Sequence, residues 1–196
     1  HSKLYPDAVS HGSNPGIEAT RDAVEYVTGL QIQSYVLVDM AAFTQLIDSL
    51  GGIDINVQQR LPIGGQKEDL SDVKGWIEAG PQHMDGYHAL WYARSRHSTT
   101  DYDRMRRQHE VEAAVLKQMD PANVLTHFQS IAGAGQKLVK TDIPSGMLAT
   151  YVDLAIQAKS QGIKSVELVP PVVNVIHPNF DEIHNLIKQA FTAKSK

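Results

Sequence analysis

Residues 35–57 read YVLVDMAAFTQLIDSLGGIDINV and contain the clearest sign of the fold. The apolar run 35–38 is typical of a buried strand. Four apolar residues then recur at the spacing of an amphipathic helix: Phe43, Leu46, Ile47 and Leu50. We expect this helix to end at Gly51-Gly52 and the alternating run 53–57 to form the next strand. A strand, a helix and a strand in so short a stretch resemble a βαβ unit and predict an α/β fold.

The flanking sequence predicts mainly helices. Asn14-Pro15 is typical of a helix start and Gly29 of a helix end. Further helices are expected from Asp85 to Trp91, from Asp101 or Asp103 to Met119, and at 125–131, 142–155 and 183–191. Ser165–Val169 is expected to be a short strand, Arg94–Arg96 an extended segment, and 58–82 a surface hairpin or loop. We see no internal repeat and no domain linker, so we predict one domain over residues 1–196.

Composition excludes several classes of protein. The chain has 196 residues, of which 42% are hydrophobic, and a formal net charge of −4. An acidic balance argues against broad nucleic-acid binding, which usually needs an excess of Lys and Arg. The absence of cysteine rules out disulfides and cysteine-based zinc sites. No apolar run is long enough to span a membrane, and the first residues do not resemble a signal peptide. Because the chain begins with His1, we expect it to be a piece of a longer protein.

Five of the seven arginines fall in one short stretch, which we call the arginine cluster: Arg94, Arg96, Arg104, Arg106 and Arg107. The planar guanidinium group stays charged at physiological pH and grips phosphate through paired hydrogen bonds. A concentration of arginine in a net acidic chain therefore predicts a local anion site.

Spacing suggests how the cluster converges. In an extended segment Arg94 and Arg96 project to the same side. On the following helix Arg104, Arg107 and Gln108 share one face, near an N-terminus that itself favours anions, whereas Arg106 points elsewhere. We expect Asp101 and Asp103 to cap this helix and to orient the guanidinium groups. A turn between the segments then creates a pocket suited to pyrophosphate; the alternative is a solvated helix face with Arg–Asp pairs of little energetic weight.

Two arginine motifs resemble those of a known family. Asp85-Gly86, Ala89-Leu-Trp-Tyr-Ala-Arg94-Ser-Arg96 and Asp101-Tyr-Asp-Arg104-Met-Arg-Arg107-Gln108 are similar to the signature of the LytR–CpsA–Psr family. The segment 35–54 resembles the strand, helix, Gly-Gly and strand that precede this signature. The stretch from Lys3-Leu4 to Leu30 resembles the part before that, although Tyr5 stands where the family usually has Asn.

The resemblance implies a three-layer α/β/α sandwich with a mixed central sheet. It implies an extracytoplasmic enzyme of the cell envelope, anchored by an N-terminal transmembrane segment that this chain lacks. Such enzymes are phosphotransferases that move a glycopolymer from a polyprenyl-pyrophosphate carrier to peptidoglycan, usually with Mg²⁺. By the same resemblance, the Mg²⁺ ligands lie upstream of this chain, which corresponds to the C-terminal part of the catalytic domain and needs the missing N-terminal half as a partner.

Site residues follow from matching positions. Arg94, Arg96 and Arg104 match catalytic positions that contact pyrophosphate. Lys3, Asp101 and Gln108 match substrate-binding positions, to which the shared helix face adds Arg107. No residue of this chain is predicted to be a metal ligand, because the nine histidines lack the helical spacing of ligand pairs.

Two other functions remain open. One is a non-catalytic module that binds a polyprenyl-phosphate lipid or an anionic wall polymer. The other is a transcriptional regulator, which the acidic charge and the absence of a DNA-reading helix disfavour.

Overall fold

The computed structural model describes residues 14–64, 71–96, 100–118, 139–147, 149–151, 153–154, 157, 166–174 and 176–192. The chain forms two compact units. One comprises 1–35 with 161–196, and the other comprises 36–160. Our prediction of one domain over 1–196 stays a prediction. Within the described residues, no helix combines the length and apolar character needed to cross a membrane.

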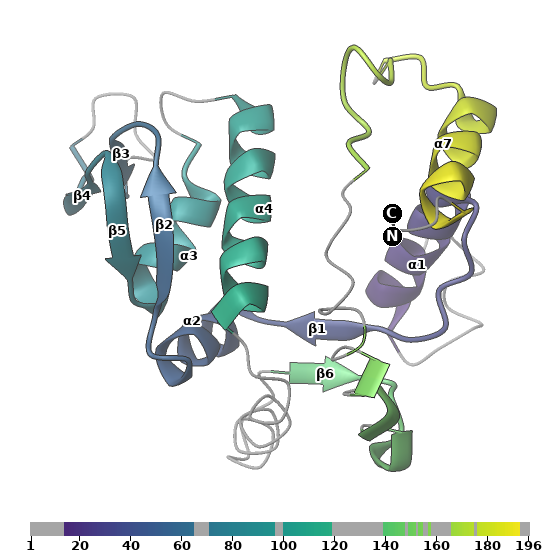
Figure 1. The fold of residues 1–196 in the computed structure, drawn as a ribbon, viewed down its shortest axis with the longest axis horizontal. Coiled ribbons are helices and arrows are strands. Elements are labelled where there is room, and N and C mark those ends of the chain that lie inside the picture. Colours follow the sequence, from purple (N-terminus) through teal and green to yellow (C-terminus); the bar gives the residue numbers. More distant parts are fainter. Residues whose placement is uncertain are drawn as a thin grey trace. The chain divides into compact units, whose positions relative to one another are not determined.

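The first unit is built on two helices, α1 (Pro15–Thr28) and α7 (Phe180–Thr192), which pack against each other (Figure 1). The Asn14 side chain caps α1, and Gly29 ends it in the left-handed conformation with φ 69°. Both ends were predicted from the sequence. The apolar face of α7 was predicted as well, and Ile183 and Ile187 are buried there.

The second unit alternates strands and helices, which confirms the α/β class. Among the described residues its elements include β1 (Val36–Val38), α2 (Met40–Ser49), β2 (Ile53–Val57), β3 (Leu61–Ile63), β4 (Gly75–Ile77), β5 (Gly80–Met84), α3 (Gly86–Arg94), α4 (Asp101–Gln118), β6 (Val139–Thr141) and the 3-10 turn Ser145–Met147. The described pairings are β1–β6, β2–β5 and β3–β4, all antiparallel. Parallel pairs of the expected mixed sheet are not among them.

Strands β2, β3, β4 and β5 form a two-stranded antiparallel ribbon, which we call the ribbon. β2 and β5 pair along one part of it, and the β3–β4 hairpin continues it. Val57 pairs with Gly80, and Leu61 pairs with Ile77. Residues 58–60 therefore face residues 78–79, so one strand carries an extra residue, as in a bulge. The predicted hairpin at 58–82 is thus present, but β3 is buried in the core and is no surface loop.

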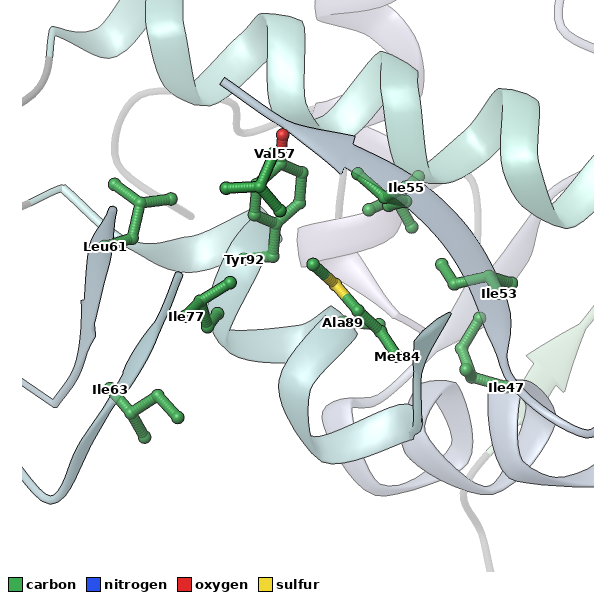
Figure 2. Packing of buried hydrophobic residues seen from close by; sticks show 11 residues of the cluster. Ile47, Ile53, Ile55, Val57, Leu61, Ile63, Ile77, Met84, Ala89 and Tyr92 are labelled. Carbon is green, nitrogen blue, oxygen red and sulfur yellow. The ribbon is translucent and has the colours of Figure 1, made fainter. Parts of the chain in front are cut away.

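The core lies between the ribbon, α3 and α4. Alternation along β2 buries Ile53, Ile55 and Val57, as predicted. Figure 2 shows side chains from β2, the β3–β4 hairpin and α3 gathered in one cluster. From α4, Val111 enters the cluster, and Ala114 and Val115 pack against it. Burial of these apolar surfaces is the main force that holds α4 on the ribbon.

Several predictions fail or lie outside the described residues. β1 is a strand, but its three side chains are 41–49% exposed, so it is not the buried strand that an apolar run suggested. β1 and β2 lie in two separate two-stranded sheets, so they do not pair with each other as neighbouring strands of a βαβ unit. Residues 166–169 are not a strand. The helix expected at 125–131 lies outside the described residues; of the one expected at 142–155, residues 149–151 and 153–154 are helical.

Candidate functional site

The helix α3 is placed by its contact with α2. Asp85 caps its N-terminus by accepting from the backbone N–H of His88 at 2.9 Å, and this hydrogen bond lowers the pKa of Asp85. The backbone N–H of Gly86 donates to Oδ1 of Asp48 at 2.7 Å. A Cβ on Gly86 would lie 2.1 Å from the carbonyl oxygen of Thr44. The two helices therefore approach at a distance that only glycine permits.

The C-terminus of α3 carries the first arginines. Arg94 is the last residue of the helix, and the backbone N–H of Ser95 caps it by donating to the carbonyl of Trp91. The prediction that Arg94–Arg96 is extended is therefore wrong for Arg94, because the helix runs one turn further than its apolar pattern indicated. The guanidinium of Arg94 lies 5.6 Å from the ring centroid of Trp91, a cation–π distance.

The helix α4 begins with a reciprocal cap. The backbone N–H and the hydroxyl of Thr100 both donate to Oδ2 of Asp103, at 2.9 and 2.8 Å. The backbone N–H of Asp103 donates back to the Thr100 hydroxyl at 3.1 Å. This arrangement is a capping box, with Asp in place of the usual Glu. Of the two predicted capping acids, Asp103 takes this role.

Asp101 joins the two arginine-bearing segments. Its Oδ1 atom lies 2.9 Å from Nη2 of Arg96 and 2.9 Å from Nη1 of Arg104. Arg96 is 67% exposed, whereas Arg104 is 26% exposed. We call Arg96, Asp101 and Arg104 the Asp101 junction. The predicted convergence of the two segments, and the orienting role of Asp101, are therefore present for these residues.

The charge at the junction holds Asp101 ionised. The hydrogen bond from Arg96 is the largest cause that lowers the pKa of Asp101, and the charge of Arg104 adds to it. Because Asp101 is the first residue of α4, its carboxylate also lies at the positive end of the helix dipole. The same position suits any other anion that meets the two guanidinium groups.

Arg107 has a different environment from its neighbours. Its side chain is buried, with 1% exposed. Nε donates to the carbonyl of Tyr92 at 2.9 Å, and Nη2 donates to the carbonyl of Ser95. Burial lowers the pKa of Arg107, yet the group has hydrogen-bond acceptors at the end of α3. We predicted Arg107 as a substrate-binding side chain; its burial and its bonds to α3 instead favour a positioning role.

The other residues that we singled out, Gln108, Arg106 and Lys3, do not share one environment. Gln108 is exposed, and its Nε2 lies 3.4 Å from the carbonyl of Ala93, so it also lies beside the end of α3. Arg106 pairs with Glu110 at 2.7 Å and with Asp103 at 3.7 Å, directed away from the junction as expected. Lys3 lies outside the described residues.

One acidic residue near the cluster was missed by sequence reasoning. Glu110 accepts hydrogen bonds from the hydroxyl of Tyr92, from Arg106 and from Gln58. Burial and the bond to Glu110 raise the pKa of Tyr92, so the phenol stays protonated. The only sequence signal was the i, i+4 spacing of Arg106 and Glu110, which is common on solvated helices.

Among the described residues, no three His, Asp or Glu side chains are grouped so as to hold a metal ion. His83 hydrogen-bonds Asp54 at 2.7 Å, and His88 hydrogen-bonds Asp85 at 2.7 Å. His109 is exposed on α4, and His97 lies outside the described residues.

Comparison with known proteins gives a family match and curated relatives. The model of the LytR_cpsA_psr family matches residues 5–191. The regulatory protein MsrR of Staphylococcus aureus is 28% identical over 181 residues, which cover 87% of this chain and 53% of MsrR. The polyisoprenyl-teichoic acid–peptidoglycan teichoic acid transferase TagV of Bacillus subtilis is 31% identical over 134 residues, covering 67% of this chain and 34% of TagV.

Solved structures show the same fold. The crystal structure of Bacillus subtilis TagV matches with a TM-score of 0.61 and 24% identity, covering 93% of this chain and 71% of that chain. A Streptococcus agalactiae protein matches with a TM-score of 0.69 and 22% identity, covering 97% and 66%. Against the curated sequences the coverage is lower, so this chain spans about a third to a half of the length of the relatives it matches.

Proposed function

This chain belongs to the LytR–CpsA–Psr family, and from that membership we propose that it is part of a cell-wall glycopolymer phosphotransferase. The proposed donor is a glycopolymer linked to a polyprenyl-pyrophosphate carrier, and the proposed acceptor is peptidoglycan. The name of TagV, a teichoic acid transferase acting on peptidoglycan, supports this class of reaction. Such a reaction takes place at the cell envelope, outside the cytoplasmic membrane.

One observation carries the proposal. Arg96 and Arg104 come from two different segments, and both lie 2.9 Å from the same oxygen of Asp101. Two guanidinium groups that meet at one carboxylate oxygen have the spacing to share a phosphate oxygen. In phosphoryl transfer the protein mainly positions the phosphate and neutralises the charge that develops on it, and arginine supplies both.

Each residue has a proposed role. Arg96 and Arg104 hold the diphosphate and stabilise the departing lipid phosphate. Arg94, exposed at the end of α3, and Gln108, beside it on α4, add contacts to the same group. Asp101 keeps the two guanidinium groups together before the substrate arrives, and Lys3 is proposed as a further phosphate ligand.

Mg²⁺ remains part of the proposal from the family alone. A divalent ion would neutralise charge on the diphosphate oxygens. The described residues form no group of three acidic or histidine side chains that fits it, so no step is assigned to the ion here. We propose that its ligands come from residues outside this chain.

Binding of polyprenyl pyrophosphate tests the proposal. We expect the chain to bind this lipid in detergent micelles and Arg104→Ala or Arg96→Ala to remove binding without unfolding the chain. Arg60→Ala is the matched control, because Arg60 is an exposed arginine that pairs with Glu78 on the ribbon. Full affinity in both junction variants would refute the proposed site.

A second candidate is a module that binds the lipid or an anionic wall polymer without transfer. The contacts of Arg96 and Arg104 with one oxygen of Asp101 fit it as well, because two guanidinium groups can hold a phosphate whether or not transfer follows. A transfer assay with the full-length protein, donor lipid, peptidoglycan and Mg²⁺ separates the two. Transfer supports the enzyme, whereas binding without transfer supports the module.

A further inference from the structure

Glu110 connects three elements of the second unit. Its side chain is 27% exposed. Oε1 accepts from Arg106 at 2.7 Å and from Nε2 of Gln58, just after β2, at 3.4 Å. Oε2 accepts from the hydroxyl of Tyr92 on α3. A carboxylate with donors from α3, from α4 and from the residue that follows β2 restricts how these parts move relative to one another.

Tyr92 is held by α4 at both of its polar groups. Its ring is buried in the core, with 1% exposed. The hydroxyl donates to Glu110, and the backbone carbonyl accepts from Nε of Arg107. Glu110 and Arg107 are three residues apart and so lie on the same face of α4. The last turn of α3 is therefore fastened to α4 at two points.

The residues that make these two contacts are close in sequence to those of the Asp101 junction. Tyr92 precedes Arg94 and Arg96 on the α3 side, and Glu110 follows Arg104 on α4. A shift of α3 along α4 would carry Arg96 away from Arg104.

We propose that Glu110 is a positioning residue for the anion site: through its hydrogen bond to Tyr92 it fixes the separation of Arg96 from Arg104. This proposal rests on the proposed function of the junction. In this proposal Glu110 does not contact the substrate. Its effect is on the geometry of the guanidinium groups, which must be held closely for paired phosphate contacts.

The first test measures binding of inorganic pyrophosphate and of polyprenyl pyrophosphate by calorimetry. We expect Glu110→Ala and Tyr92→Phe each to weaken binding about tenfold, the equivalent of about 1.4 kcal/mol. Glu110→Gln keeps an oxygen acceptor for Tyr92 and is expected to retain more affinity than Glu110→Ala. The double variant Tyr92→Phe with Glu110→Ala is expected to be no weaker than Glu110→Ala alone, because both remove one contact. Additive losses, or unchanged affinity in Glu110→Ala, would overturn the proposal.

A second readout does not depend on a ligand. The pKa of the Asp101 carboxyl, followed by NMR, reports whether Arg96 and Arg104 still meet it. We expect this pKa to rise in Tyr92→Phe and in Glu110→Ala and to stay unchanged in Arg60→Ala. An Asp101 pKa that does not move in either variant contradicts the positioning role even if pyrophosphate does not bind.

Different results would refute the proposed function of the junction and the positioning role of Glu110. If Arg104→Ala keeps full affinity, the proposed function is wrong. If Arg104→Ala loses binding while Glu110→Ala and Tyr92→Phe keep it, only the positioning role is wrong. Thermal unfolding of each variant shows whether a loss of binding reflects a loss of fold. If Glu110→Ala does not fold, Tyr92→Phe tests the same contact, because it removes the hydroxyl that donates to Glu110.

Discussion

Nε of Arg107 lies 2.9 Å from the carbonyl oxygen of Tyr92, and this buried bond ties the last turn of α3 to α4. A second bond from Nη2 reaches the carbonyl of Ser95, the residue that caps α3. A guanidinium at the C-terminus of a helix also offsets the negative end of its dipole. Arg107, the buried arginine of the cluster, thus fastens to α4 the end of α3, which carries Arg94.

Arg107→Ala is expected to destabilise the chain by about 2–4 kcal/mol, because two buried carbonyl oxygens lose their charged donor. Arg107→Lys is expected to recover only part of this, since an ammonium group lacks the fork that reaches both carbonyls. Urea denaturation measures both. Arg60→Ala, which removes an exposed pair, should change the unfolding free energy far less. Equal effects of the two alanine variants would contradict a structural role for Arg107.

The Asp101 carboxyl is expected to titrate below its ordinary pKa of about 3.9, because Arg96 and Arg104 favour its charged form. A lowered pKa in the folded state means that its contribution to stability is present above the ordinary pKa. That contribution is lost as the pH falls through the lowered pKa. In Arg96→Ala the pKa should move up toward the ordinary value. Carbon-detected NMR titration checks this, and a pKa unaffected by Arg96→Ala would show that the ion pair does not persist in solution.

The pKa of His83 should be shifted upward, so its contribution to stability should depend on pH in the opposite sense to that of Asp101. The hydrogen bond to Asp54, and then the one to the carbonyl of Gly51, raise the pKa of His83. A raised pKa contributes stability that is fully present below the pKa of the unfolded histidine and is lost as the pH rises through the folded value. Asp54→Asn should lower the pKa of His83 in an NMR titration. The stability difference between Asp54→Asn and the parent should then shrink at alkaline pH; a constant difference would rule out this linkage.

Gly86→Ala is expected to destabilise the second unit by about 1–3 kcal/mol, because the added methyl would meet the backbone of Thr44. The backbone of α2 cannot give way as a flexible side chain would, so α3 must shift. Gly146→Ala is the matched control, since a Cβ there meets nothing within 4 Å. Thermal unfolding compares the two variants. If Gly86→Ala and Gly146→Ala unfold at the same temperature, the close approach of α2 and α3 is not required for stability.

Local patterns were sufficient for most helices and for the strands at the start of the second unit. Asn14 and Gly29 bound α1 as predicted, because caps depend on residues within one turn. The alternation of 53–57 gave the buried face of β2 correctly. Burial of β1 could not be read in this way, since an apolar run says nothing about which elements cover it.

At the arginine cluster, residue type and spacing indicated an anion site but not the roles of individual side chains. Arg104 and Arg107 are one helical turn apart and look alike in sequence, yet one meets Asp101 and the other is buried against α3. The difference arises because the carbonyl oxygens of Tyr92 and Ser95, at the end of α3, lie within hydrogen-bond reach of Arg107. Hydrogen bonds between segments far apart in sequence, such as that from Tyr92 to Glu110, exist only once the core has brought the helices together. Periodicity and capping are local properties and are written in consecutive residues, whereas the partner of each guanidinium is set by tertiary contacts.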